Sequence, residues 1–160
     1  MKLILIIIII VILIYISCYY IFPNEITILQ TTIEHFDFNL LSSRQPIIIS
    51  DYIKEPEEII NSWFKYNITS KEENDEIEEN IDWQHNNHKY IYINANEDTE
   101  LIIYKAQITK INPKPDDKII IIKLEKNQSI ILPFKWKYYG DKINKYYIDD
   151  IITFFSGRLV

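Results

Sequence analysis

The chain begins with its longest apolar stretch. Leu3–Phe22 is a run of 20 residues without a charged side chain, preceded by Lys2 and followed by Pro23. A helix of about 20 apolar residues spans roughly 30 Å, which is the thickness of the hydrocarbon core of a bilayer. Because backbone amides in lipid must be hydrogen-bonded within the segment, such a run forms a helix there. The pattern predicts a transmembrane anchor over residues 1–22.

The residues at the two ends of this run predict its orientation. Lys2 and the α-amino group precede it, and the first base that follows it is Arg44. Positive charge favours the cytoplasmic side, so we expect a single-pass protein with a cytoplasmic N-terminus and residues 23–160 across the membrane. An aromatic belt at the lipid headgroups would be formed by three tyrosines, Tyr15, Tyr19 and Tyr20.

Two other interpretations of the apolar run stay open. A cleaved secretory signal has small residues before its cleavage site, and the run has no A-x-A-like site. A bacterial lipoprotein signal would place the acylated cysteine at Cys18 in "IYISC", although Tyr15 is bulky for the third position before it. In that case the chain would be a lipoprotein-type surface binding module.

Residues 23–44 form a polar lead-in, and its alternation over Ile26–Ile33 predicts one strand. The apolar run in "RQPIIISD", bounded by Pro46 and Asp51, predicts a buried strand. Together they place the start of a compact domain at residue 45, which we expect to continue to residue 160.

The stretch "SDYIKEPEEIINSWFKYN" predicts a helix. Pro56 suits the first helical turn, and the two glutamates after it favour the positive end of the helix dipole. One helix face carries the apolar side chains, and we expect it to pack on a sheet: Ile59, Ile60, Trp63 and Phe64. The next segment, 71–82, is dominated by acidic residues and predicts a solvated loop.

From Lys89 onward the pattern predicts short strands separated by turns. The strand segments are "KYIYIN", "ELIIYKAQI", "KIIIIKL" and "SIILPF", and polar segments such as "NPKPDD" separate them. The last stretch, "NKYYIDDIITFFSGRLV", is compatible with a strand or a short helix that Gly157 would cap. Several short strands joined by turns indicate an antiparallel sandwich or barrel, so we expect a mainly β domain with one or two helices.

Composition narrows the function classes. The net charge of −6 and the pI of about 5.1 argue against a nucleic-acid partner, which needs clustered Lys and Arg. Two glycines exclude a phosphate-binding loop, and one cysteine excludes an intrachain disulfide and a cysteine zinc cage. Abundant Ile, Asn and Lys with little Arg are typical of an AT-rich genome.

The stretch "ILPFKWKYYG" is basic and aromatic in an otherwise acidic chain. A candidate binding surface, able to stack on sugars, bases or protein, consists of Lys135, Trp136, Lys137, Tyr138 and Tyr139. Strand alternation gives a second interpretation that needs no ligand. In it Phe134, Trp136 and Tyr138 point inward, while the lysines and Tyr139 point outward.

Three stretches together resemble the cupin-like, Jumonji-type double-stranded β-helix family. "RQPIIISD" resembles an early strand of that family, the helix with Trp63 follows in the matching place, and "KLEKNQSIILPFKWKYY" resembles its late segment with a Pro turn, a Trp and a metal-ligand His. An anchor followed by such a domain also resembles membrane-anchored proteins of large DNA viruses that infect eukaryotes. The resemblance implies a cupin-like β-roll preceded by a transmembrane helix.

Active members of this family hold Fe(II) with a His-x-Asp/Glu pair and a distal His, and can use 2-oxoglutarate. At the distal position this chain has Lys137, whose ammonium has no lone pair to donate. The remaining metal-ligand candidates are the pair His35 and Asp37, with His85 or His88 as a third ligand. An oxygenase with an atypical metal site is the alternative to a non-catalytic role.

The sequence thus predicts a membrane-anchored, non-catalytic structural or interaction protein of a virion or host membrane, with a metal-less cupin-like domain and no cofactor. Its expected partners are the lipid bilayer and other virion or membrane proteins. Two Asn-x-Ser/Thr triplets would be glycosylation acceptors if the domain is lumenal, at Asn67 and Asn127.

Overall fold

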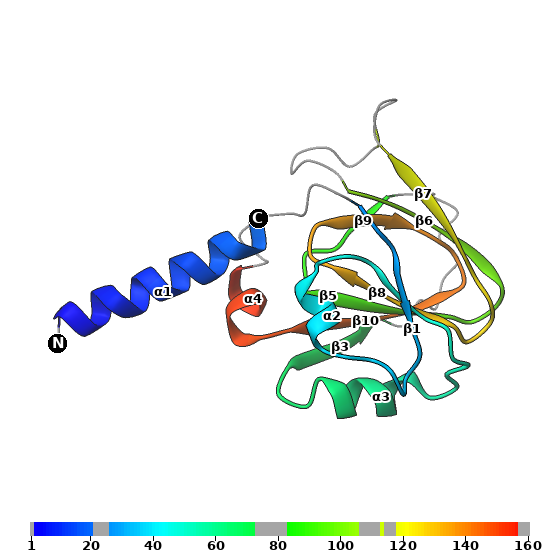
Figure 1. Cartoon of the computed structure of the whole chain (residues 1–160), viewed down its shortest axis with the longest axis horizontal. Coiled ribbons are helices and arrows are strands. Elements are labelled where there is room, and N and C mark those ends of the chain that lie inside the picture. The colour runs from blue at the N-terminus through cyan, green and yellow to red at the C-terminus, as the bar shows by residue number, and fades with distance from the viewer. Residues whose placement is uncertain (1, 21–25, 73–82, 106–112, 114–117, 157–160) are drawn as a thin grey trace.

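The structure is a computed structural model that describes residues 2–20, 26–72, 83–105, 113 and 118–156. It consists of a β domain from which one helix, α1, projects (Figure 1). The predictions for residues 73–82 of the acidic loop, and for Gly157, lie outside the described residues.

Two sheets form the β domain. We call the six-stranded one sheet A, and its strand order is β1-β2-β8-β5-β10-β3. Its strands are β1 (Leu29–Thr31), β2 (Ile47–Ile49), β3 (Ile68–Glu72), β5 (Tyr90–Ala95), β8 (Ser129–Pro133) and β10 (Ile143–Asp149). The four-stranded sheet B has the order β4-β9-β6-β7, with β4 (Gln84–His85), β6 (Thr99–Lys105), β7 (Ile119–Leu124) and β9 (Trp136–Tyr139). All pairs are antiparallel except β1 with β2. The prediction of a mainly β fold is confirmed.

The first core lies between the two sheets and follows from strand alternation. It takes Ile91 and Ile93 from β5, Leu101 and Ile103 from β6, and Trp136 from β9, all fully or almost fully buried. Every second residue of these strands therefore faces the opposite sheet, and the residues between them face outward.

The second core lies on the outer face of sheet A, which α3 (Pro56–Trp63) covers. Ile60 and Phe64 are buried there, and Ile59 and Trp63 pack against the same cluster. The predicted helix, its first-turn proline and its sheet-facing side are thus confirmed. A short helix, α2 (Asn39–Ser42), precedes β2 and buries Leu41 in this core.

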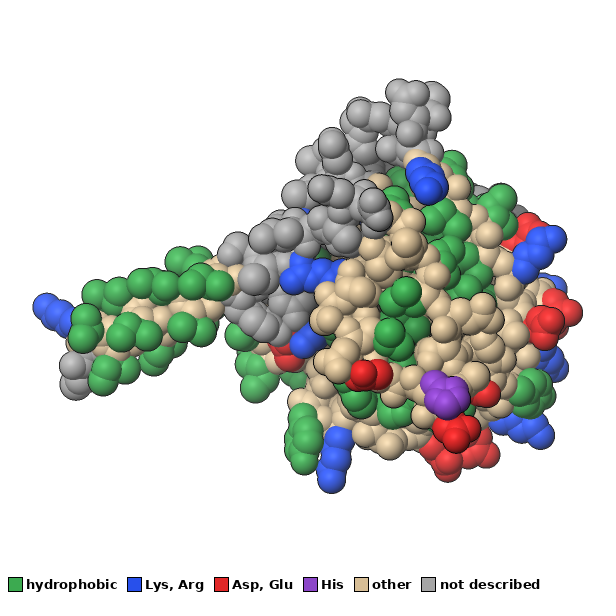
Figure 2. Space-filling model, viewed as in Figure 1, with side chains coloured by type: hydrophobic (Ala, Val, Ile, Leu, Met, Phe, Trp, Pro, Cys, Tyr) green, Lys and Arg blue, Asp and Glu red, His purple; other side chains and the backbone are tan. Residues whose placement is uncertain are grey.

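The helix α1 (Lys2–Tyr20) has 19 residues, the first of them charged. Among the residues that the structure describes, no helix is both long and apolar enough to cross a bilayer. The prediction of a transmembrane helix is therefore wrong: about 20 apolar residues are needed for a span, and α1 offers fewer. The side chains of Leu3 to Ile14 are each 38–71% exposed along the projecting helix (Figures 1 and 2).

Other boundaries differ from the predicted ones. The strand predicted over Ile26–Ile33 is only three residues long, and because β1 pairs with β2, the lead-in belongs to the β domain. The last stretch contains both of its alternatives, strand β10 and then the helix α4 (Ile151–Ser156). Two strands, β3 and β4, are additional to the predicted set, whereas β9 lies in the stretch that strand alternation also explained.

Candidate functional site

Five polar side chains from the two sheets meet beside β10: Lys145 and Tyr138 are buried, Glu72 and Tyr147 are half-buried, and Gln84 is exposed. Lys145 and Tyr147 lie on the inner face of β10, because they pair with the core residues Ile93 and Ile91 of β5. Gln84 of β4 pairs with Tyr138 of β9, whose side chain belongs to the same core. Glu72, the last residue of β3, pairs with Lys145 at the sheet edge. We call these five residues, Glu72, Gln84, Tyr138, Lys145 and Tyr147, the interior polar cluster.

A continuous hydrogen-bond network joins the interior polar cluster. The Lys145 Nζ donates to Gln84 Oε1 at 3.1 Å and forms an ion pair with Glu72 Oε2 at 3.0 Å. The Tyr147 hydroxyl donates to the same Glu72 oxygen, and Tyr138 hydrogen-bonds to Tyr147. The Lys145 side chain is 1% exposed, so the network holds a cation inside the roll.

The protonation states fit these roles. Burial raises the pKa of the Tyr138 hydroxyl, as do its hydrogen bond to Tyr147 and the nearby Glu72 carboxylate. Burial and the bond to Glu72 also raise the pKa of Tyr147, so both phenols stay protonated and can donate. Burial would raise the pKa of Glu72, but the hydrogen bonds from Tyr147 and Lys145 outweigh it, and that pKa is lowered. Glu72 is therefore the anionic acceptor of the network.

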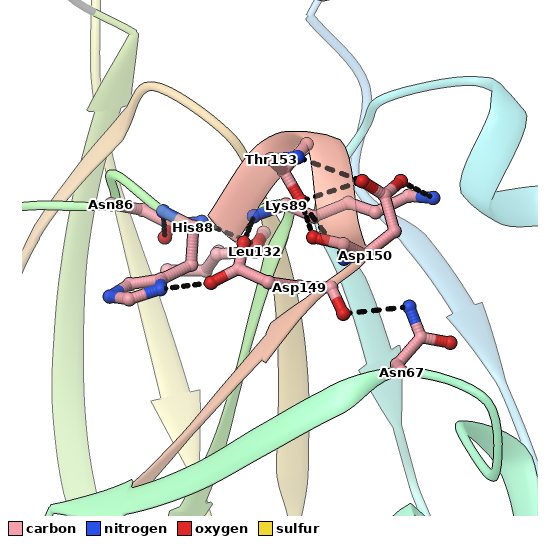
Figure 3. Close-up of polar contacts among 8 residues, drawn as sticks. All are labelled: Asn67, Asn86, His88, Lys89, Leu132, Asp149, Asp150 and Thr153. Atoms are coloured by element: carbon pink, nitrogen blue, oxygen red, sulfur yellow. Dashed lines mark hydrogen bonds and ion pairs between the residues drawn. The ribbon is translucent and has the colours of Figure 1, made fainter. Parts of the chain in front are cut away.

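A histidine and a buried aspartate lie beside the interior polar cluster. His88 Nδ1 is 2.6 Å from Asp149 Oδ2, and the His88 ring stacks on Tyr147 with 4.3 Å between ring centroids. Asp149 Oδ1 accepts the Lys89 backbone N–H, so both of its oxygens have partners (Figure 3). The pair ties the start of β5 to the end of β10, next to α4.

Asn86 connects the two sheets at the same end of the roll. Its Nδ2 donates to the carbonyl oxygens of Leu132 and Pro133, both at 2.9 Å. Its Oδ1 accepts the His88 N–H (Figure 3). All three partners are backbone groups, so Asn86 holds the end of β8 and the backbone at His88 in fixed positions. Its role is to position the β8–β9 turn and His88.

The basic and aromatic stretch is not an exposed binding surface. Lys135 and Lys137 are 1% and 2% exposed, and Trp136 and Tyr138 are equally buried, while Tyr139 is half-buried. Trp136 and Tyr138 belong to the core between the sheets, as the alternation interpretation predicts. Lys135 departs from that pattern: with a φ of 67° it lies in the β8–β9 turn rather than in a strand.

Lys137 pairs with His85 across β4 and β9, on the outer face of sheet B. Its Nζ lies 5.9 Å from the centre of the Tyr104 ring. Burial lowers the pKa of His85, and the charges of Lys137 and Lys135 lower it further. Lys137 faces away from the core between the sheets, and its place at a metal-ligand position stays a prediction from the family resemblance. The opposite face of this strand pair holds the buried Tyr138 and the exposed Gln84.

The structure does not assemble the predicted metal ligands. Asp37 accepts hydrogen bonds from the backbone and side-chain amides of Asn39, which lower its pKa, and His35 is exposed in the preceding turn. His85 and His88 point to different environments, one on the outer face of sheet B and the other beside Tyr147. Within the described parts of the chain, no three His, Cys, Asp or Glu side chains are grouped so that they could hold a metal ion.

The donor set inside the roll does not fit the Fe(II) that the family resemblance implies. A facial triad needs two imidazoles and one carboxylate with open positions. The interior polar cluster offers an amide, two protonated phenols and one carboxylate, and an ammonium lies among them. A second cation beside Lys145 would be repelled, so no metal-dependent step is assigned to this site.

The two glycosylation triplets lie at structured positions. Asn67 Nδ2 donates to the Asp149 carbonyl at 3.2 Å (Figure 3), and Asn127 has a φ of 65° in the turn before β8. Both residues are partly exposed. Their modification stays a prediction.

One signal in the sequence could have located the interior polar cluster. In "INKYYID" the strand period places a lysine and a tyrosine on the same face as Ile143, which is the buried face. A lysine buried on an apolar face requires a hydrogen-bond acceptor. Its partners Glu72 and Gln84 belong to strands that the pattern does not predict.

No protein-family model, curated protein or solved structure matches the chain.

Proposed function

We propose that the chain is a membrane-attached, non-catalytic interaction protein whose β domain is a cupin-like roll without a metal centre. The strand order supports the cupin-like assignment. Strands β3 to β10 form two four-stranded layers, β3-β10-β5-β8 and β4-β9-β6-β7. Two antiparallel layers built from eight strands are the arrangement of jelly rolls and cupins.

The observation that carries the non-catalytic role is the position of Lys145. Its buried ammonium contacts an amide oxygen and a carboxylate on the inner face of β10. The negative charge of Glu72 is neutralised by the lysine ammonium, which belongs to the chain itself, and not by a bound metal ion. The network therefore stabilises the closed roll and leaves no open coordination position for oxygen or 2-oxoglutarate.

Metal analysis of the purified full-length chain in detergent tests this role. We expect the protein to contain only substoichiometric iron, zinc or manganese, also after anaerobic incubation with Fe(II). Stoichiometric metal in the wild type that is lost in His88→Ala or His85→Ala would overturn the proposal. Ile121→Ala, which changes an exposed side chain on the edge strand β7, is the control for nonspecific loss.

Attachment to a membrane is supported by two neighbouring apolar surfaces. Each residue from Leu3 to Ile14 of α1 is exposed, so the helix is apolar and open all round. Figure 2 shows these side chains on the face turned to the viewer. A helix that is apolar all round is stable when it is buried in lipid or protein. The helix α4 contacts α1, and its Ile151 and Phe155, one turn apart on one helix face, are 70% and 67% exposed. Both surfaces would be removed from water if the domain rests on a bilayer.

Lipid exposure of α4 can be measured on the full chain. Spin labels are placed at Phe155→Cys and, as the matched control, at Ile121→Cys on the exposed edge strand β7, each in a Cys18→Ser background. In phosphatidylcholine vesicles we expect oxygen to relax the label at 155 and a water-soluble nickel reagent to relax the label at 121. Equal access of the nickel reagent to both labels would contradict contact between α4 and lipid, and failure of the chain to float with vesicles would contradict membrane attachment itself.

The side of the membrane on which the β domain lies stays a prediction. So do the virion or host membrane as its location, and other virion or membrane proteins as its partners. The association of the full chain with vesicles can be measured without these assignments.

A further inference from the structure

A polar groove of about 590 Å³ lies on the outer face of sheet A, beside the start of α3. Asparagine is its most frequent lining residue. We call this cavity the asparagine groove because five asparagines line it: Asn61, Asn94, Asn96, Asn127 and Asn144. Its volume is in the range of small-molecule sites, although its lining is more polar than that of most such sites.

Asn94 forms the floor of the groove and is 2% exposed. Its Nδ2 is hydrogen-bonded to the Ile53 and Asn127 carbonyls and to Ser129 Oγ. Among the described residues, none donates a hydrogen bond to Asn94 Oδ1. This oxygen is not among the buried atoms that lack a hydrogen-bond partner, so it stays accessible from the groove and can accept an O–H or N–H group of a ligand.

The wall of the groove offers further donors and acceptors. Asn96 and Asn144 bind each other through reciprocal amide hydrogen bonds of 3.1 and 2.6 Å, which fixes both side chains. Each amide keeps one N–H and one oxygen lone pair for a ligand. The amides of Asn61 and Asn127 make no side-chain hydrogen bond to a described residue. The groove thus presents fixed amides that can both donate and accept.

Charge and apolar surface narrow the ligand class. Lys54 and Lys71 line the groove together with Glu55, Glu57 and Glu58, and Lys71 is paired with Glu57 at 3.1 Å. Two lysines against three glutamates leave only a small negative excess, which disfavours an anionic ligand and suits a neutral one. The apolar lining is Pro56 and the nearly buried Tyr146, so the groove lacks the side-chain pockets that a peptide uses.

We propose that the asparagine groove binds a neutral carbohydrate. A saccharide hydroxyl donates and accepts at once, as the amides do, and a hydroxyl directed at Asn94 Oδ1 would donate to that accessible oxygen. This inference rests on the proposed interaction role and names its ligand class. It is independent of the metal content and of vesicle association, so its failure is distinguishable from theirs.

The test uses the full chain in a detergent without a sugar headgroup, produced in a host that does not glycosylate Asn127. A panel of neutral oligosaccharides is screened, and the affinity of the best one is measured by titration calorimetry. We expect Asn61→Ala with Asn144→Ala to weaken binding at least about tenfold, because fixed hydrogen bonds are lost. Asn39→Ala, an exposed asparagine outside the groove, should bind as the wild type does.

Three results would overturn the carbohydrate site. The first is no binding of any neutral oligosaccharide by folded protein. The second is an affinity that the double substitution leaves unchanged. The third is binding of neutral peptides at this groove in place of sugars, detected with the same variants.

Discussion

Lys145 and Glu72 form an ion pair of 3.0 Å whose two partners differ strongly in exposure: 1% for the lysine side chain and 42% for the glutamate. The ammonium is therefore fully desolvated, whereas the carboxylate retains part of its hydration. Gln84 supplies a second oxygen to the lysine. The stability of the roll thus depends on keeping this cation fully hydrogen-bonded.

Shortening or neutralising Lys145 tests that dependence. Lys145→Ala leaves a cavity and removes the cation, so we expect a loss of about 3 kcal/mol in the free energy of unfolding. Lys145→Met keeps most of the volume and should cost only about 1–2 kcal/mol, because Glu72 can turn to water. Urea unfolding of the full chain in detergent, followed by near-UV circular dichroism, measures both.

The matched control is the exposed pair Lys142–Glu97, whose atoms are 2.7 Å apart. Lys142→Met should change the free energy of unfolding by less than about 1 kcal/mol, since both partners are solvated. If Lys145→Ala proved as mild as Lys142→Met, the interior network would not be the stabilising element inferred from its geometry.

Asn86 gives the second prediction. Replacing it by leucine leaves the Leu132 and Pro133 carbonyls and the His88 N–H without their partner, and the site is almost completely buried. We expect a loss of about 2–4 kcal/mol, set by the desolvation of groups left unbonded. Differential scanning calorimetry checks it, with Asn39→Leu as the exposed control. Equal melting temperatures for the two variants would contradict the role assigned to Asn86.

The parts of the fold that the sequence predicts are those with a clear period. The helix with Pro56 and the strands of "KYIYIN" or "SIILPF" were predictable because burial imposes a regular spacing on them. The exposed edge strand β3 and the two-residue β4 carry no apolar run, since they are defined by pairing with β10 and β9. The interior polar cluster depends on these two strands, so its full membership required tertiary pairing.

The stretch "FKWKYY" shows the same limit at single residues. Its alternation correctly separates Trp136 and Tyr138 from Lys137, but the burial of the lysines does not follow from the pattern. A lysine in a sequence predicts a position on the protein surface unless a side chain that could pair with it in the interior is known. The length of the N-terminal apolar run likewise predicts a membrane-spanning helix. The helix that the structure describes is shorter than that run.

The lowered pKa of His85 predicts how the stability of the folded protein changes with pH. Its pKa in the folded protein is lowered from the ordinary value of 6.5, first by burial and then by Lys137 and Lys135. As the pH falls through 6.5, the unfolded chain therefore binds a proton before the folded protein does, and stability decreases until the folded pKa is reached. The urea midpoint should be lower at about pH 5.5 than at about pH 7.5.

His85→Gln should reduce this decrease, because a neutral amide replaces the imidazole. His35→Gln, which changes an exposed histidine in a turn, should retain the wild-type pH dependence. An unchanged pH dependence in His85→Gln would show that another group causes the decrease.

Gly140 provides a steric prediction for the end of β9. A Cβ placed on it would lie 2.7 Å from Leu101 Cδ1, closer than real Cβ contacts, and Leu101 is completely buried. Gly140→Ala should therefore destabilise the domain by about 1–3 kcal/mol through overpacking. Leu101→Val removes the clashing methyl group at a cost of about 1 kcal/mol, and the double variant should be more stable than the sum of the two single effects predicts. A double-mutant cycle from urea unfolding measures this coupling, and strictly additive effects would contradict direct contact between the two positions.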